Sequence, residues 1–381
     1  FLFSQAEFRH NVITHHCEIR WTEEAGFLPL TDRDVNTLWG RMNKTVGRVY
    51  LTDIYNVIHS EFVPLFNPFQ SYFDHLPSWD GVSDPIGDLA DTVHVKSDQA
   101  EFRDYFRKWF VGILPALLDD TVVNHEILVL IGEQGLYKTT WFNFLLPPEL
   151  RCYFYTKTNS DRLNKDDLFS LTEFALICFE ELDGMRPAEL NQLKAMVTMP
   201  YVNERAAYGR NKERHPHIAS FCGTGNNVQF LTDPTGNRRW LPFEVSQIRD
   251  PHLHAIPYEL VYSQAYALWK SGFCHWFSQE EIRKLNMHNS RFEVPNLEED
   301  LIRTHFRKPF EGEAGIFVTA ADILEQISSC LRYPLSPNKI GRIMAGLEFE
   351  SIRYKGKRGY VTVKKTGEDI DRERRSGALG L

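Results

Sequence analysis

The stretch GEQGLYKTTW, residues 132–141, directly follows the apolar run Ile127–Ile131. An apolar strand, a glycine-rich turn and then Lys138-Thr139 are typical of a phosphate-binding loop with the pattern G-x-x-x-x-G-K-[ST]. In such a loop, successive backbone N–H groups point at one anion and the following helix dipole reinforces the site. The sequence therefore predicts nucleotide binding by Gly132, Glu133, Gln134, Gly135, Leu136, Tyr137, Lys138, Thr139 and Thr140.

One position departs from this pattern, because Tyr137 stands where the second glycine belongs. If this residue needs a positive φ, a tyrosine there costs about 1–3 kcal/mol of strain. Lys138 is expected to reach the β- and γ-phosphates, and the Thr139 hydroxyl to bind Mg²⁺. The alternative is a strand, turn and helix that merely contain a lysine.

Two adjacent carboxylates, Glu180 and Glu181, follow the apolar run Phe174–Phe179. Neighbouring carboxylates at the end of a buried strand repel each other and lose solvation, so they have little structural purpose there. A bound Mg²⁺ supplies a purpose: Glu180 would hold the ion, and Glu181 would polarise the attacking water. The two roles are interchangeable, and Asp183 is a third candidate. The alternative is a solvated loop start.

Polar groups also follow the third apolar run, His217–Cys222. An amide from Asn226 or Asn227 could sense a γ-phosphate or position the attacking water, although asparagine after a strand is usually a turn residue. Further on, Arg238 and Arg239 follow a tight turn, and arginine presents a fork of donors that suits phosphate oxygens. Supplied by a neighbouring subunit, one of them could act as an arginine finger. The alternative is a surface pair that faces carboxylates.

Two basic segments are candidates for DNA contact. Residues 203–215 carry four basic and two acidic side chains around a tyrosine and a glycine, as a hairpin that tracks a single strand would. The segment 351–365 is a basic hairpin that follows two short helices. Solvated charge and protein docking are the respective alternatives. The predicted DNA-binding residues are Arg205, Arg210, Lys212, Lys339, Arg342, Lys355, Lys357 and Arg358.

The composition describes a soluble globular protein. The chain has 381 residues, 43% hydrophobic and 25% charged, with a formal net charge of −8, which argues against a protein coated in nucleic acid but not against local basic patches. The longest apolar runs are too short to cross a bilayer, so no membrane association is expected. Six scattered cysteines without a C-x-x-C pair indicate reduced thiols in a cytoplasm. A first residue other than Met suggests a fragment of a longer chain.

The patterns along the chain predict an α/β P-loop core with a parallel sheet between two other regions. Short buried strands alternate with helices, and Pro187 marks the start of one helix. A capping box at Thr319–Asp322 and a Ser336-Pro337 start precede two short helices near the end. The predicted divisions are a helical region 1–120, an ATPase core 121–250, a helical lid or linker 251–305, a winged-helix-like domain 306–366 and a flexible tail 367–381.

The order of motifs resembles the virulence-associated protein E family over most of the chain. The motifs are GEQGLYKTTWF, FEELDGM, LKAMV, YGR, CGTGN and DPTGNRRWLPFEV, with PSWDG upstream and QAYALW and SQEE downstream. The C-terminal segments FVTAADILEQIS, LSPNKIGRIMAGL and YKGKRGY resemble a module of its Bacteroides-type members. This family consists of P-loop ATPases of phages and mobile elements, related to superfamily 3 helicases within the AAA+ class.

The resemblance implies roles for individual residues. Lys138 and Thr139 would bind ATP, Glu180 and Glu181 would serve Mg²⁺ and water activation, Asn226 would be the sensor, and Arg238 or Arg239 the finger. It also implies a bacterial cytoplasmic protein, a hexamer-type ring with single-stranded DNA in its channel and duplex at the winged helix, and a primase domain or partner.

Three functions are compatible with these patterns. The favoured one is a DNA helicase or translocase that replicates a mobile element. The second is a nucleotide-dependent switch, for example in phage interference, that hardly hydrolyses ATP because of Tyr137. The third is a DNA-binding adaptor that is not an enzyme.

Overall fold

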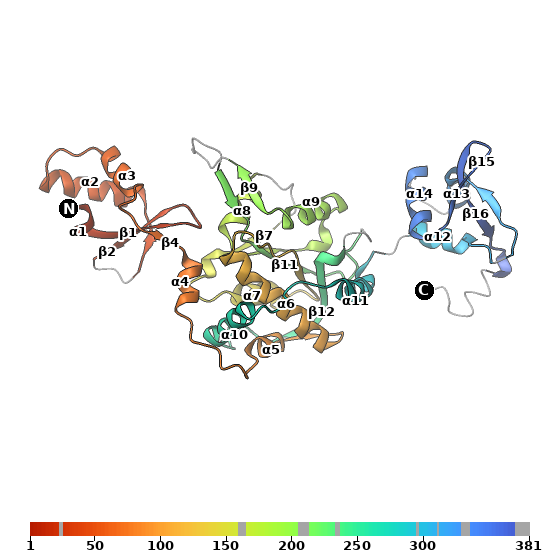
Figure 1. Cartoon of the computed structure of the whole chain (residues 1–381), viewed down its shortest axis with the longest axis horizontal. Coiled ribbons are helices and arrows are strands. Elements are labelled where there is room, and N and C mark those ends of the chain that lie inside the picture. Colours follow the sequence, from red (N-terminus) through yellow and green to blue (C-terminus); the bar gives the residue numbers. More distant parts are fainter. Residues whose placement is uncertain are drawn as a thin grey trace. The chain divides into compact units, whose positions relative to one another are not determined.

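The computed structural model describes residues 1–22, 26–158, 165–204, 213–232, 237–294, 297–310, 312–328 and 336–369. The chain divides into two compact units, Phe1–Glu293 and Val294–Leu381 (Figure 1). Among the described helices, none has both the length and the apolar character needed to cross a bilayer. Most of the predicted tail, from residue 370 on, lies outside the described residues.

The first 66 residues contain a small sheet in the order β3-β2-β1-β4, so the expectation of a helical start was wrong there. Apolar and polar residues alternate in β1 and β2, and Ala6, Phe8, Cys17 and Ile19 are buried. A period of two is the signature of a strand with one buried face. The elements are α1 (Leu2–Gln5), β1 (Ala6–Asn11), β2 (Cys17–Trp21), β3 (Leu28–Pro29), α2 (Asp32–Thr45), α3 (Leu51–Ile58) and β4 (Leu65–Phe66).

A six-stranded sheet forms the centre of the first unit, in the order β5-β12-β6-β11-β8-β7. Its strands are β5 (Val93–Val95), β6 (Ile127–Ile131), β7 (Phe154–Lys157), β8 (Leu176–Phe179), β11 (Ser220–Gly225) and β12 (Trp240–Ile248). The pairings from β12 to β7 are all parallel, whereas β5 is antiparallel to β12. The predicted α/β core with a parallel sheet is therefore confirmed.

Helices cover both faces of this sheet, which explains why every residue of β6 is buried (Figure 1). Residues Leu128 and Leu130 share one core cluster with α6, α7 and α10, and their neighbours along β6 share another with α9. The helices of this region are α6 (Gln99–Leu118), α7 (Lys138–Leu145), α8 (Lys165–Glu173), α9 (Pro187–Val197), α10 (Tyr258–Lys270) and α11 (Gln279–Asn289). Pro187 does begin α9, as predicted.

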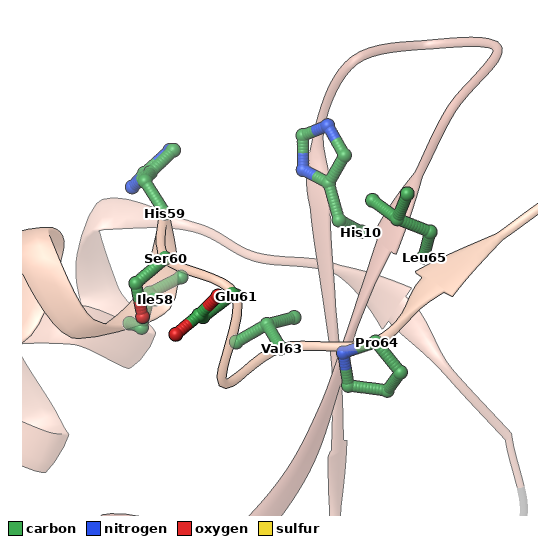
Figure 2. Close-up of a pocket in the computed structure, with 8 residues that line it drawn as sticks. All are labelled: His10, Ile58, His59, Ser60, Glu61, Val63, Pro64 and Leu65. Carbon is green, nitrogen blue, oxygen red and sulfur yellow. The ribbon is translucent and has the colours of Figure 1, made fainter.

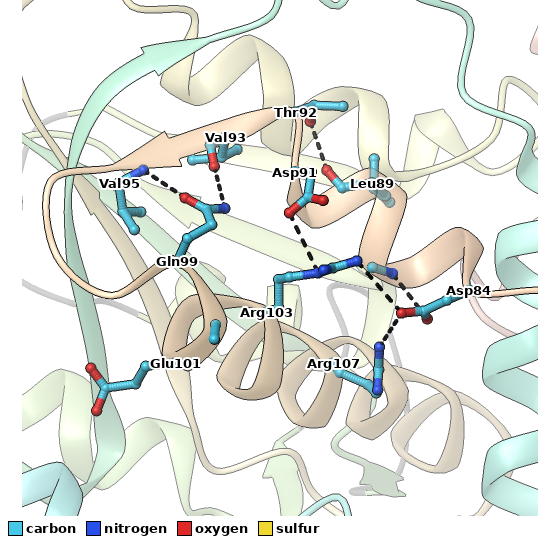
Figure 3. A network of polar contacts seen from close by, with 12 residues as sticks. Asp84, Leu89, Asp91, Thr92, Val93, Val95, Gln99, Glu101, Arg103 and Arg107 are labelled. Atoms are coloured by element: carbon cyan, nitrogen blue, oxygen red, sulfur yellow. Dashed lines mark hydrogen bonds and ion pairs between the residues drawn. The ribbon is translucent and has the colours of Figure 1, made fainter.

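A polar network fastens the segment before α6 to the core (Figure 3). The carboxylate of Asp84 accepts hydrogen bonds from Arg107 Nη2 at 2.5 Å and from Gln264 Nε2 at 2.9 Å. Arg103 lies between Asp84 and Asp91, with nitrogen–oxygen distances of 3.8 and 3.4 Å. The network thus holds the helix α5 (Pro85–Ala90) against α6 and α10, and the helix α4 (Pro68–Asp74) packs against the same two helices.

The second unit has its own core. Its elements are α12 (Leu297–His305), β13 (Phe306–Arg307), β14 (Ile316–Val318), α13 (Ala320–Ser328), α14 (Pro337–Gly346), β15 (Ser351–Tyr354) and β16 (Lys357–Lys364). The strand β16 pairs with β13, β14 and β15, all antiparallel. Ile302 of α12 is fully buried against Ile323 and Ile340 of this core. The boundary therefore lies before α12, about a dozen residues earlier than the sequence suggested.

Candidate functional site

The loop of residues 132–137 joins β6 to α7 at the carboxyl edge of the parallel sheet. Gly132 is required by close packing, because a Cβ atom there would lie 2.9 Å from the backbone oxygen of Val245. Gly135 has φ +90°, a backbone conformation that favours glycine. Both glycines therefore have structural reasons to occupy their places in the loop.

Tyr137 adopts the left-handed conformation, with φ 60° and ψ 17°. For a residue with a β-carbon, this conformation costs about 1–2 kcal/mol. Its side chain is 42% exposed, so packing recovers only part of that cost. The positive φ on which the strain expectation depended is thus present at this position.

The Lys138 ammonium is buried at the base of the loop, and this burial lowers its pKa. Nζ donates to the backbone oxygens of Gly132 and Glu133, at 2.6 and 2.8 Å, and to Asn226 Oδ1 at 3.3 Å. The last contact joins the loop to the residue that follows β11. Lys138 and Asn226, 88 positions apart in sequence, therefore share one site.

The Thr139 hydroxyl donates to Glu180 Oε1 at 2.7 Å, so the first turn of α7 meets the end of β8. The next residue, Glu181, has φ 55° and is the second residue of the site in the left-handed conformation. A hydroxyl and a carboxylate in contact are oxygen donors that can hold Mg²⁺ directly or through water. A pocket of about 420 Å³ is lined by residues 134–140 with Glu180, Glu181, Thr224 and Asn226.

Asp183 acts on the loop after β11. Its carboxylate accepts hydrogen bonds from the backbone N–H groups of Asn226 and Asn227, both at 3.1 Å. A Cβ atom at Gly225 would lie 3.0 Å from Asp183 Oδ1, so a glycine lets the carboxylate approach this closely. The sequence predicted Asp183 as a third candidate, beside Glu180 and Glu181, for binding Mg²⁺ or activating the water. Its spacing from Glu181 gave no indication that it holds Asn226 in place.

The profile of the virulence-associated protein E-like domain matches residues 74–294, more than half of the chain. The chain belongs to this family. No curated protein sequence matches it.

Among solved structures, the C-terminal region of NrS-1 (residues 305–718, apo) is similar to this virulence-associated protein E-like chain. The identity is 12% and the TM-score 0.48, over 96% of this chain and 97% of that one. A second apo structure of the same region gives 11% identity and a TM-score of 0.46, over 95% and 97%. The ADP complex of Hsp104 from S. cerevisiae gives 12% identity and a TM-score of 0.28, over 71% of this chain and 42% of that one.

Arg238 and Arg239 of this family member lie at the opposite edge of the sheet from the loop of residues 132–137. They end the short 3₁₀ turn Asn237–Arg239 just before β12, and Trp240 pairs with Ile127, the first residue of β6. The phosphate-loop candidate follows the last residue of β6, about 13 Å further along the strand at ~3.3 Å per residue. Arg238 is exposed and Arg239 half-buried. The structure therefore does not bring either arginine into the pocket.

The predicted DNA-binding residues fall into three groups. Arg205, Arg210 and Lys212 lie outside the described residues, between β9 (Tyr201–Glu204) and β10 (Glu213–Pro216), which pair antiparallel. Lys339 forms an ion pair with the buried Glu298, and Arg342 lies on the same helix α14. Lys355, Lys357 and Arg358 surround the β15–β16 turn and are exposed. Arg342 and the turn residues thus present accessible charges, whereas Lys339 has a carboxylate partner.

A pocket of about 500 Å³ lies in the N-terminal part, between β1 and the residues that follow α3 (Figure 2). His10, His59 and Glu61 are among its lining residues. Burial, together with the neighbouring His59 and His16, lowers the pKa of His10. This pocket contains none of the predicted site residues.

Proposed function

We propose that this protein is a Mg²⁺-dependent ATPase that moves on DNA, as a helicase or translocase would, in the replication of a phage or mobile element. The observation that carries the proposal is the convergence of Lys138, the Thr139–Glu180 pair and Asn226 around one pocket at the carboxyl edge of a parallel sheet. Ligands bind at this edge in open α/β sheets. We therefore propose that the core is a P-loop fold of the AAA+ type.

Each side chain has a role that its position supports. The loop and the first turn of α7 would bind the phosphates, with Lys138 exchanging its carbonyl contacts for phosphate oxygens. Thr139 and Glu180 would hold Mg²⁺, which neutralises the charge that develops on the phosphates. Glu181 would orient and deprotonate the attacking water, and Asn226, held by Asp183, would position it.

The arginines support an oligomer. Since Arg238 and Arg239 lie at the other edge of the sheet, neither can reach the nucleotide of its own subunit. An exposed Arg238 could reach a nucleotide bound to a neighbouring copy, as an arginine finger in a hexamer-type ring does. We therefore propose a homo-oligomeric ring in which hydrolysis requires two adjacent subunits.

The remaining parts would contact DNA. The segment between β9 and β10 is the candidate for tracking a single strand in the ring channel. The helices, strands and basic turn of the second unit support our proposal that it is a winged-helix-like domain that binds duplex DNA. A primase domain or partner, and a bacterial cytoplasm, complete the proposal.

The test is steady-state ATP hydrolysis with Mg²⁺, with and without single-stranded DNA, at several protein concentrations. We expect DNA to stimulate hydrolysis, the specific activity to rise with protein concentration, and Lys138→Ala to abolish both. Lys284→Ala, which removes an exposed lysine of α11, is the matched control and should leave the rate unchanged. No hydrolysis and no saturable nucleotide binding by the unaltered chain would refute the proposal.

The strained tyrosine favours a second candidate, an ATP-dependent switch with little turnover. In that case the unaltered chain binds a fluorescent ATP analogue but hardly hydrolyses ATP, and Tyr137→Gly raises the rate. Hydrolysis by the unaltered chain at a rate that Tyr137→Gly does not change would exclude the switch.

A further inference from the structure

Asn289, a fully buried residue at the end of α11, contacts the backbone on both sides of Arg238 and Arg239. Nδ2 of Asn289 donates to the backbone oxygen of Asn237 at 2.7 Å and to that of Trp240 at 3.0 Å. Arg238 and Arg239 are the two residues between these carbonyls. The side chain of Asn289 has no exposed surface.

The chemistry of these contacts fixes the orientation of the amide. Carbonyl oxygens only accept hydrogen bonds, so the NH₂ group of Asn289 must face them. A side-chain amide has two N–H donors, and both are used on these two carbonyls. Both side-chain N–H groups of Asn289 therefore donate to the backbone that flanks Arg238 and Arg239.

Both ends of this connection are fixed to other elements. Nδ2 of the buried Asn237 donates to Glu293 Oε1 at 2.8 Å. Nε2 of His288, the residue before Asn289, lies 2.6 Å from the backbone oxygen of Pro242 in β12, and Nδ1 lies 2.9 Å from Glu101 of α6. The end of α11 is thus tied to β12 and α6, and it holds the arginine turn in a set position.

We propose that Asn289 is a positioning residue for the arginine turn, which it holds so that Arg238 projects from the amino edge of the sheet toward the nucleotide of a neighbouring subunit. This inference rests on the proposed ATPase function. The exposure of the two arginines assigns their parts: Arg238 is the exposed one, whereas Arg239 is half-buried, and this burial and the neighbouring Arg238 lower its pKa. Among the described residues, Asn289 donates to Asn237 and Trp240, neither of which lines the pocket, so its effect on hydrolysis acts through the turn.

The first test measures the turn without measuring activity. Asn289→Leu keeps the branched shape of the side chain and removes both donors, whereas Asn286→Leu changes an exposed asparagine of the same helix. Trypsin cleaves after Arg238 and Arg239, and mass spectrometry gives the rate relative to cleavage after Arg107 in the core helix α6. Two neutral hydrogen bonds at about 1 kcal/mol each correspond to a rise of roughly 30-fold in this relative rate. An unchanged ratio would overturn the inference, as would an equal rise in Asn286→Leu.

The second test asks whether the turn acts on a neighbouring subunit. We expect Asn289→Leu to lower kcat at least about tenfold while the affinity for a fluorescent ATP analogue stays within about twofold, since an arginine finger is worth far more than tenfold. Mixed with Lys138→Ala, which has an intact turn and a defective loop, the variant should hydrolyse ATP faster than either protein alone. Arg238→Ala mixed with Lys138→Ala is the positive control.

The outcomes separate this inference from the function on which it rests. If the Arg238→Ala mixture gains activity and the Asn289→Leu mixture does not, Asn289 is not a positioning residue for the arginines. If the unaltered chain hydrolyses no ATP, the proposed function has failed, and with it the catalytic part of this inference. The trypsin measurement then still decides whether Asn289 holds the turn. Asn289→Ala provides a second variant if Asn289→Leu does not fold.

Discussion

The backbone conformation of Tyr137 predicts that glycine is more stable than alanine at this position, the opposite of the usual order in a helix. At φ 60° a β-carbon costs about 1–2 kcal/mol, and glycine does not carry this cost. Glycine loses about 0.5–1 kcal/mol relative to alanine through the greater entropy of its unfolded chain. Tyr137→Gly should therefore be more stable than Tyr137→Ala by about 0.5–1 kcal/mol. Comparing glycine with alanine removes the tyrosine ring from both variants, so the difference reports the backbone alone.

The assay is urea unfolding of both variants, followed by circular dichroism, with the same pair of substitutions at Asn143 in the helix α7. At a helical position glycine is less stable than alanine by about 1 kcal/mol. The two sites should thus give differences of opposite sign. If glycine is the less stable residue at both sites, residue 137 does not occupy the left-handed region and the strain argument is wrong.

Three further predictions concern the rest of the molecule. Burial raises the pKa of Glu126 to about 7 from an ordinary value of 4.5, so the folded state retains a proton that the unfolded state has lost. The free energy of unfolding should thus fall by at most about 3 kcal/mol as the pH rises from 4.5 to 7, and then level off. In urea titrations at pH 5 and 8, Glu126→Gln should show a smaller difference in the free energy of unfolding than the unaltered chain. Replacing Lys355, Lys357 and Arg358 together by alanine should weaken duplex binding and reduce the slope of log K against log salt by about 2–3, whereas Lys284→Ala should leave that slope unchanged. Gly359→Ala should lower the urea concentration at which the second unit unfolds, because the added Cβ would lie 2.5 Å from the backbone oxygen of Val318. Gly346→Ala is the control, since a Cβ there meets nothing within 4 Å. Equal unfolding midpoints for the two variants would contradict this packing argument.

The sequence predicted the parts of the fold that carry a local signal. The apolar runs that became β6, β8 and β11 are buried throughout, and a continuous apolar run is what a strand covered on both faces requires. The helices α13 and α14 begin at the predicted capping residues, because capping is a contact between near neighbours.

The parts that were missed have weak or contradictory local signals. In β12, Pro242 pairs with Val129 of β6, whereas β5 pairs only with residues 245–248, and a proline in a run normally argues against a central strand. The strands β1 and β2 have only six and five residues, so the alternation of apolar and polar residues in each is a weak signal. The second left-handed residue of the site, Glu181, also has no mark in the sequence, because glutamate is not a residue that favours positive φ.

Sequence order alone also misleads about which side chains can meet. Asn226 and Arg238 are 12 positions apart and both follow β11, so counting along the chain places them in one neighbourhood. The direction of β12 separates them. Because β12 runs parallel to β6, the chain must return from the carboxyl edge after β11 to the amino edge before β12 begins, and it carries the arginines with it. The same topology that gathers Lys138, Glu180 and Asn226 at one edge therefore keeps Arg238 out of its own subunit's pocket, so the arginine finger that we propose would have to act on a second subunit.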